Sequence, residues 1–149
     1  MGGSGRPPSP PDARDAPAKP WRPSAPPARA ELLFAYGTLM RGYALHPVLA
    51  GGATFLGEAR VRGRLLDLGG YPGLVDGSGT VRGELYRIDD PELLAAIDRE
   101  EGYNFERRRA TVTLASGARR RVWLYRYKGP RARAIPIPDG DYRRRVPCR

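Results

Sequence analysis

Two adjacent glutamates near the end of a predicted helix, Glu100 and Glu101, are the residues best placed to transfer protons. Leu93, Leu94 and Ile97 have helical spacing and form one apolar face. At about 100° per residue, Glu101 falls on the edge of that face, whereas Glu100 lies further round. Desolvation and the helix dipole both disfavour a charged carboxylate that points inward at a helix C-terminus. The pKa of Glu101 is therefore expected to rise toward the range of a general base.

The ends of this helix are marked by residues with clear local preferences. Asp90 is a suitable N-cap, and Pro91 suits the first helical position because its missing N–H would be unpaired there. Gly102 is well placed to end the helix in a left-handed conformation. The sequence therefore predicts a helix over residues 91–101. Both terminal glutamates could still be solvated charges, which is the alternative to a catalytic role for Glu101.

A second candidate element is the turn that follows the first predicted strand, which begins near Glu31. The apolar run from Leu32 to Tyr36 is typical of a short buried strand. It ends at Gly37, Thr38 and Leu39, where backbone N–H groups exposed in a turn can bind an anion or a carbonyl oxygen. A plain connection between strand and loop is the alternative.

Strand patterns make up most of the remaining chain. Strands are predicted over residues 54–68 (as one strand or a hairpin), 80–88, 109–114 and 121–127, with turns at 69–73 and 76–79 and a short helical turn at 46–49. On the last strand, Trp123, Tyr125 and Tyr127 share one face. Core packing is expected for Trp123, whereas the Tyr125 hydroxyl needs a partner and could line a polar pocket. The order of elements predicts an α+β fold with a mostly antiparallel sheet that curls toward a barrel.

By composition, the 149-residue chain divides into three parts. Residues 1–30, rich in Pro, Ala, Gly, Ser and Arg, are predicted to be disordered, residues 31–142 to form the domain, and residues 143–149 to form a basic tail. More than half of the net charge of +10 falls in residues 1–30 and 131–149. Nucleic acid is therefore an unlikely partner, because nucleic-acid-binding domains more often concentrate charge on the folded face. No signal or membrane-spanning segment is recognised, so a cytoplasmic location is expected.

Several other chemistries find no support in the residues present. Cys148 is the single cysteine and His46 the single histidine, so neither a disulfide nor a Cys/His metal site is expected. Ser78 lies in Gly-Ser-Gly and not in a nucleophile elbow, and no phosphate-binding or dinucleotide-binding glycine loop occurs. A carboxylate base, exposed amides and tyrosines remain. These suffice for a reaction in which the substrate supplies its own nucleophile.

Five short motifs occur in a fixed order along the chain: Tyr36-Gly37-Thr38-Leu39, Gly70-Tyr71-Pro72-Gly73, Gly83-Glu84-Leu85-Tyr86, Asp98-x-x-Glu101-Gly102-Tyr103, and Trp123-x-Tyr125. With the later Gly140-Asp141-Tyr142, this series resembles the gamma-glutamylcyclotransferase-like family over residues 32–142. The resemblance implies a small mixed barrel with flanking short helices.

The resemblance also implies an activity and a site. Glu101 would be the general base, and the turn from Tyr36 through Gly37 and Thr38 to Leu39 would hold a gamma-glutamyl group by backbone contacts, with Tyr71 and Tyr125 as pocket neighbours. The freed α-amine of the substrate would attack its own γ-carbonyl and release 5-oxoproline and an amine or amino acid. No metal or cofactor is implied, and the leaving group is not fixed by the resemblance.

Two other classes of function remain open. The domain could be a small-molecule-binding module that has the same fold without turnover, although the presence of Glu101 argues against this reading. Alternatively, the basic terminal segments could give weak binding to nucleic acid.

Overall fold

The computed structural model describes residues 30–147 of the chain. The predictions for residues 1–29 and for Cys148 lie outside the described residues. No helix within residues 30–147 has the length and apolar character needed to cross a membrane. In chain order, the elements are β1 (Leu32–Ala35), α1 (His46–Leu49), β2 (Ala53–Asp67), β3 (Pro72–Ile88), α2 (Leu93–Glu101), β4 (Phe105–Leu114), β5 (Arg119–Tyr127), β6 (Ile135–Pro136) and α3 (Tyr142–Arg145).

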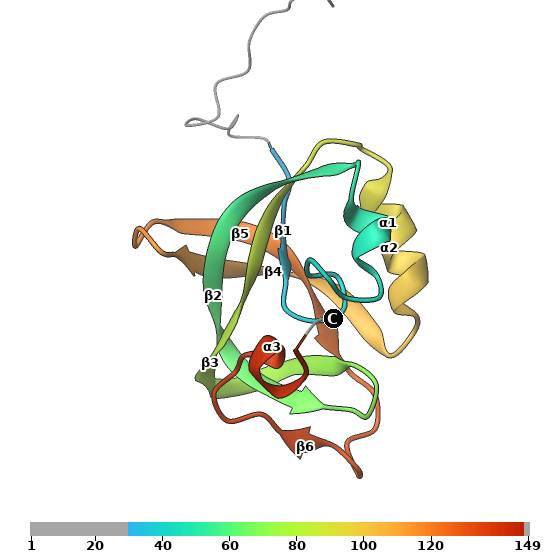
Figure 1. Ribbon diagram of the computed structural model, residues 1–149, viewed down its shortest axis with the longest axis vertical. Helices are drawn as coiled ribbons and strands as arrows, with labels where there is room; N and C mark the ends of the chain where they lie inside the picture. The colour runs from blue at the N-terminus through green and yellow to red at the C-terminus, as the bar shows by residue number, and fades with distance from the viewer. Residues whose placement is uncertain (1–29, 148–149) are drawn as a thin grey trace, which may run out of the picture. The chain divides into compact units, whose positions relative to one another are not determined.

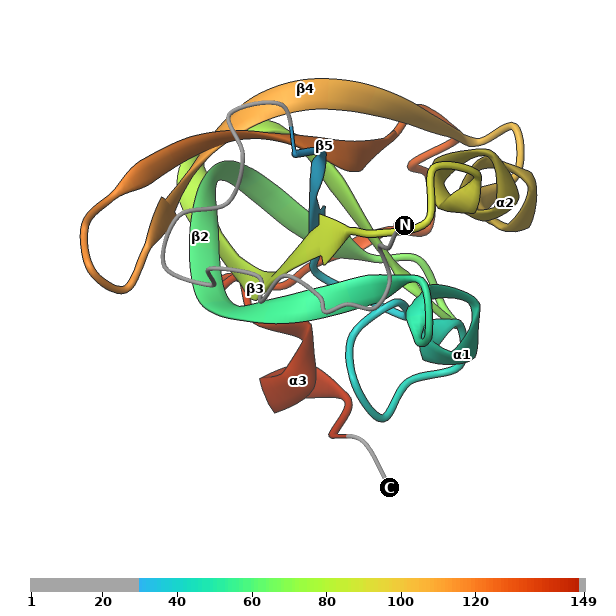
Figure 2. The same cartoon turned by 90° about the horizontal axis from the view of Figure 1, so that it is seen from above.

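Five strands of the domain form a closed barrel (Figures 1 and 2). Antiparallel pairing joins β1 to β3, β3 to β2, β2 to β4 and β4 to β5, and a parallel contact between β5 and β1 closes the ring. The short helices α1 and α2 lie side by side against one side of the barrel (Figure 1). The prediction of a small, mostly antiparallel barrel with flanking short helices is confirmed.

The β2–β3 hairpin accounts for much of the barrel wall, and its irregularities explain one wrong prediction. β2 is a single strand, and Gly57 and Gly63, both at positive φ, lie at its two shifts in register. Four residues of β3, 76–79, lie opposite the single residue Gly63, since Arg62 pairs with Thr80 and Arg64 with Val75. The turn predicted at 76–79 is therefore a bulge inside β3, and the strand continues through it.

Alternating apolar residues fill the barrel interior. The largest side chains that are fully buried on the strands are Leu33, Phe34, Val75, Val81, Leu85, Val112, Val122 and Leu124. Burying each such side chain contributes roughly 1.5–3 kcal/mol. Trp123 lies between Val122 and Leu124 on β5 and packs against the core only in part. Its ring lies outside the barrel, beneath the guanidinium groups of Arg107 and Arg109.

Helix α2 carries the two candidate glutamates and is anchored at both ends. It begins at Leu93, two residues later than predicted, although the Asp90 side chain still accepts a hydrogen bond from the Glu92 amide. Leu93 and Ile97 are buried against the core. Gly102 ends the helix at φ 79° and ψ 179°, a region that is essentially restricted to glycine. This sharp exit starts the link to β4, which begins at Phe105.

Part of the predicted C-terminal tail forms a short helix. Arg143, Arg144 and Arg145, assigned to a basic tail from the sequence, form helix α3 together with the buried Tyr142. The Asp141 side chain caps this helix by accepting a hydrogen bond from the Arg143 amide at 3.0 Å. Arg143 also pairs with Glu58 on β2 at 2.9 Å. These contacts hold α3 against the barrel.

Candidate active site

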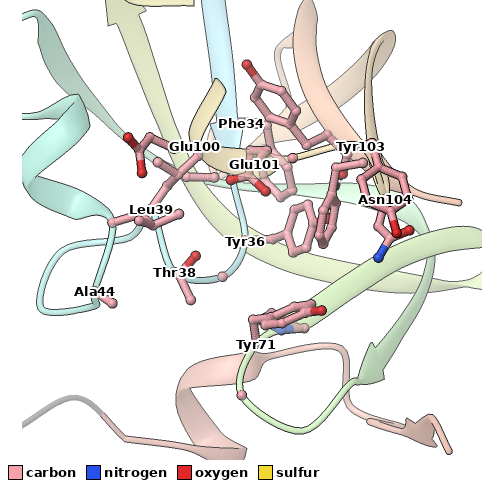
Figure 3. A pocket seen from close by; sticks show the side chains of 18 residues that line it. Phe34, Tyr36, Thr38, Leu39, Ala44, Tyr71, Glu100, Glu101, Tyr103 and Asn104 are labelled. Atoms are coloured by element: carbon pink, nitrogen blue, oxygen red, sulfur yellow. Dashed lines mark hydrogen bonds between the residues drawn. The ribbon is translucent and has the colours of Figure 1, made fainter. Parts of the chain in front are cut away.

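One cavity of about 390 Å³ lies between the turn after β1, the start of β3 and the C-terminal end of α2. Figure 3 shows side chains from these three segments converging on it. All seven residues predicted for the site line this cavity, namely Tyr36, Gly37, Thr38, Leu39, Tyr71, Glu101 and Tyr125. The fold therefore brings together residues that are up to 89 positions apart in sequence.

Glu101 is the acid that faces the cavity. Figure 3 shows its carboxylate turned toward the middle of the cavity near Tyr36, whereas the Glu100 carboxylate points away. Glu101 is half-buried and Glu100 is exposed. Burial disfavours the charged carboxylate and raises the pKa of Glu101 to about 7. At neutral pH a group with this pKa can both accept and return a proton.

Tyr36 forms part of the cavity wall with its hydroxyl fully engaged. That hydroxyl donates a hydrogen bond to the Tyr125 carbonyl at 2.6 Å and accepts one from the Leu74 amide at 3.2 Å. Burial, and secondarily the negative charge of Glu101, raise the pKa of Tyr36 well above its ordinary value. Tyr36 therefore stays neutral and ties β1 to β3 and β5 beneath the site.

The turn at Gly37–Leu39 presents free amides at the cavity wall. Its carbonyl groups are engaged, since Gly37 accepts from the Met40 amide and Thr38 accepts from the Leu45 amide. Within residues 30–147, by contrast, no group accepts a hydrogen bond from the amides of Gly37, Thr38 or Leu39. The turn also requires glycine, because a Cβ at Gly37 would lie 2.6 Å from Cγ of Pro72.

Tyr125 contributes its ring to the cavity while its hydroxyl points to a neighbouring acid. The hydroxyl donates to Asp98 Oδ1 at 2.5 Å, and Arg107 binds both carboxylate oxygens of Asp98 at 3.0 and 3.2 Å. The predicted need of this hydroxyl for a partner is met within the protein. Tyr71 lies at the cavity edge, half-exposed, with its ring edge-on to Phe105 at 5.9 Å.

A buried acid that was not predicted as part of the site, Glu84, anchors the loop that carries the Gly37–Leu39 turn. Glu84 on β3 is only 2% exposed and accepts hydrogen bonds from the Arg41 amide, the Arg41 Nε and the Tyr86 hydroxyl at 3.0, 3.2 and 2.7 Å. Arg41 lies two residues after Leu39, so its contacts with Glu84 hold the end of the Gly37–Leu39 turn in place. The sequence feature that could have revealed Glu84 is an acid placed between the apolar residues of a strand.

The charge of the cavity is wholly acidic. Among the described residues that line it, Glu100 and Glu101 are the charged ones, and none is Lys, Arg or His. Six aromatic rings also contribute: Phe34, Tyr36, Tyr71, Tyr103, Phe105 and Tyr125. In the part of the chain that the structure describes, no group of three or more His, Cys, Asp or Glu side chains could hold a metal ion.

The raised pKa of Glu101 predicts a dependence of stability on pH. Unfolded chains release this proton near pH 4.5, whereas the folded protein keeps it until about pH 7. Between these values the folded state binds more protons, so its stability falls as the pH rises. Relative to Glu101→Gln, which cannot ionise, the wild type should lose up to about 3 kcal/mol of unfolding free energy across this window.

Denaturant unfolding of both proteins at pH 4 and pH 8 measures this difference. The variant should be the more stable protein at pH 8, and the gap should close at pH 4, where Glu101 is protonated in both states. An unchanged gap at the two values would mean that the Glu101 carboxyl titrates normally.

Comparison with known proteins places this barrel in a family. Residues 33–144 match the family described as "Gamma-glutamyl cyclotransferase, AIG2-like". A Vibrio cholerae protein, named as a proposed gamma-glutamylcyclotransferase, is 38% identical over 117 residues, which cover 77% of this chain and 97% of that protein. The chain therefore belongs to the gamma-glutamylcyclotransferase, AIG2-like family.

Two further relatives extend this result. The solution structure of the protein ytfP from Escherichia coli is similar to this structure, with a TM-score of 0.58 and 34% sequence identity. The matched region covers 76% of this chain and 97% of the ytfP chain. A gamma-L-glutamyl-butirosin B gamma-glutamyl cyclotransferase of Niallia circulans is 39% identical over 72 residues, or 48% of this chain and 46% of that protein.

Proposed function

We propose that the protein cyclises the gamma-glutamyl group of a small molecule to 5-oxoproline and releases the attached amine. The observation that supports this most is the pairing, in one cavity, of a carboxyl group whose pKa is about 7 with three backbone amides that no described residue uses. Such a pair supplies a base and an oxyanion site, and the reaction needs no nucleophile from the protein.

In this proposal the ionised Glu101 removes a proton from the α-ammonium of the substrate. The freed amine attacks the γ-carbonyl carbon, and a five-membered ring forms. The amides of Gly37 to Leu39 stabilise the oxyanion. Glu101 returns its proton to the leaving nitrogen, and the bond between that nitrogen and the carbonyl carbon breaks as the carbonyl re-forms. The ring nitrogen, which still carries two hydrogens, gives one of them to the released amine, so that the products are 5-oxoproline and an ammonium ion. Attack within one molecule gives the large proximity advantage of an intramolecular reaction.

The cavity also favours one kind of leaving group. An amino acid or peptide leaves with a carboxylate, which would have no basic partner among the described lining residues and would approach Glu100 and Glu101. A neutral or cationic amine meets no such repulsion, and aromatic faces such as that of the exposed Tyr103 attract cations. The Niallia circulans relative, by its name, acts on gamma-L-glutamyl-butirosin B. We therefore propose a gamma-glutamyl amine as the substrate.

A matched substrate panel tests this choice. Gamma-glutamyl amides of a neutral amine and of a diamine are compared with a gamma-glutamyl amino acid, and 5-oxoproline release is followed by liquid chromatography. The amine-derived substrates should have kcat/KM values about tenfold or more above that of the amino acid derivative, which corresponds to roughly 1.4 kcal/mol. Preference for the amino acid derivative would contradict the assigned leaving group, and release from none would contradict the proposed activity.

The alternative of a binding module with the same fold predicts a different outcome. Such a module would bind gamma-glutamyl compounds, detectable by calorimetry, and would leave them intact. The cavity with its ionisable Glu101 supports turnover in preference to binding alone. A cytoplasmic location stays a prediction.

A further inference from the structure

The outer surface of the barrel carries a row of arginines that pairing between strands brings together. Arg60 on β2 lies directly opposite Arg82 on β3, and on its other side opposite Thr113 on β4. Thr113 in turn lies opposite Arg119 on β5. Opposite residues in antiparallel strands point to the same face, so these arginines share the outer face of the barrel. All three are exposed.

More arginines extend this row to either side. Arg62 and Arg64 follow Arg60 on the outer face of β2, and Arg121 follows Arg119 on β5. We call these six residues, Arg60, Arg62, Arg64, Arg82, Arg119 and Arg121, the arginine face. It spans β2, β3 and β5 and was not apparent from a count of charges along the chain.

Within the part of the chain that the structure describes, no acidic side chain lies within ion-pair distance of the arginine face. Among residues 30–147, none of its six members forms an ion pair; Arg62 donates to the Gly77 carbonyl at 3.4 Å and Arg121 to the Thr111 hydroxyl at 3.5 Å. Elsewhere on the domain Arg107, Arg126 and Arg143 each pair with an aspartate. Like charges placed directly opposite each other destabilise a sheet. The fold thus keeps an unfavourable concentration of positive charge at one place.

The arginine face lies away from the candidate active site. In Figures 1 and 2 the β4–β5 hairpin projects from the side of the barrel opposite α1 and α2. The cavity is lined by the end of α2 and none of the six arginines belongs to its lining. A partner bound to the arginine face would therefore leave the cavity open.

The chemistry of this face identifies the kind of partner. Guanidinium groups bind phosphate oxygens in bidentate fashion. The exposed large apolar residues of the described chain are Phe55, Tyr71, Tyr103, Ile135 and Val146, none of which belongs to the face. The ring of Trp123, two residues after Arg121 on β5, lies beneath the guanidinium groups of Arg107 and Arg109. Stacking on single-stranded bases and insertion into lipid both need exposed apolar or aromatic groups, so neither suits this surface.

We propose that the arginine face binds the sugar–phosphate backbone of double-stranded nucleic acid without sequence preference. The net charge count argued against nucleic acid, because much of the excess lies near the chain ends. The strand register supplies what that count lacked, namely a concentration of uncompensated arginines on the folded face. Binding that depends on phosphate alone is weak to moderate in affinity and falls steeply with salt.

The test compares two triple variants of the full chain that change the net charge equally. The first, Arg60→Gln/Arg82→Gln/Arg119→Gln, removes the central row. The control, Arg108→Gln/Arg131→Gln/Arg133→Gln, removes three exposed arginines outside the arginine face. Binding of mixed-sequence DNA and RNA duplexes is measured by fluorescence anisotropy over a range of salt concentrations, beside a single strand and vesicles of anionic phospholipid.

The face variant should bind duplex about tenfold or more weakly at low salt and reduce the slope of log K against log salt by about 2–3. The control should bind like the wild type, and the preferred duplex identifies DNA or RNA as the source of the backbone. The face variant should also melt no lower than the wild type and release 5-oxoproline normally. The proposal would be overturned if both variants lost duplex affinity equally or if the wild type did not bind duplex. Tighter binding of the wild type to the single strand or to vesicles would also overturn it.

Discussion

Replacing Glu101 with glutamine should lower the rate of 5-oxoproline release about 10²–10⁴-fold. Glutamine keeps the size of the side chain and can form hydrogen bonds, but it cannot accept the proton of the substrate α-ammonium. Burial already raises the pKa of Glu101 to about 7, so the wild type has a substantial ionised fraction at neutral pH. The loss should appear mainly in kcat, because the turn at Gly37–Leu39 that would hold the gamma-glutamyl group is untouched.

The neighbouring Glu100 provides a matched control for this experiment. It is an adjacent acid on the same helix and lines the same cavity, but it is exposed and its carboxylate points away from the centre (Figure 3). Glu100→Gln should therefore keep most of the activity. Near wild-type rates in Glu101→Gln, or equal losses in the two variants, would rule out Glu101 as the base.

Replacing Glu84 with alanine should have the largest effect on stability, a loss of about 3–5 kcal/mol. Glu84 is buried and accepts hydrogen bonds from the Arg41 amide, the Arg41 guanidinium and the Tyr86 hydroxyl. Arg143 lies 3.8 Å away and adds a second positive charge. Removing the carboxylate leaves these donors and charges without their common partner. Equilibrium unfolding in urea measures the change.

Glu58 is the control for Glu84 because it contacts the same two arginines from the surface. It pairs with Arg143 at 2.9 Å and with Arg41 at 3.9 Å, and half of its side chain is exposed. Glu58→Ala should therefore cost at most about 1 kcal/mol. Comparable losses of unfolding free energy in Glu58→Ala and Glu84→Ala would show that the buried Glu84 stabilises the fold no more than a surface acid does.

The parts of the site that sequence could predict are those that depend on local rules. The apolar face of α2 places Glu101 inward, and Gly102 ends the helix at a positive φ. The turn after β1 follows from an apolar run that stops at a glycine. The hydrogen-bond partners of the Tyr36 and Tyr125 hydroxyls, in contrast, lie on elements that are far apart in sequence, and no local pattern specifies them.

Three features could not be predicted from the sequence for a related reason. The glycines at 77 and 79 suggest a turn, yet the long β2 partner keeps this segment within β3 as a bulge. Glu84 alternates along β3 with the buried Leu85, and it is buried as well because the Arg41 loop and α3 cover it. Likewise the arginine face exists only through the register of β2, β3, β4 and β5. Each depends on long-range pairing, which propensity and periodicity do not encode.

The most direct test of the proposed activity is the isotope content of the product formed in water enriched in ¹⁸O. The wild-type protein is incubated with the gamma-glutamyl amine that it turns over best, and the products are analysed by mass spectrometry. Because the substrate's own amine is the attacking group, the account predicts 5-oxoproline without ¹⁸O and an equal amount of free amine. Glutamate carrying one ¹⁸O atom would instead mean that water is the nucleophile, and would contradict the cyclisation.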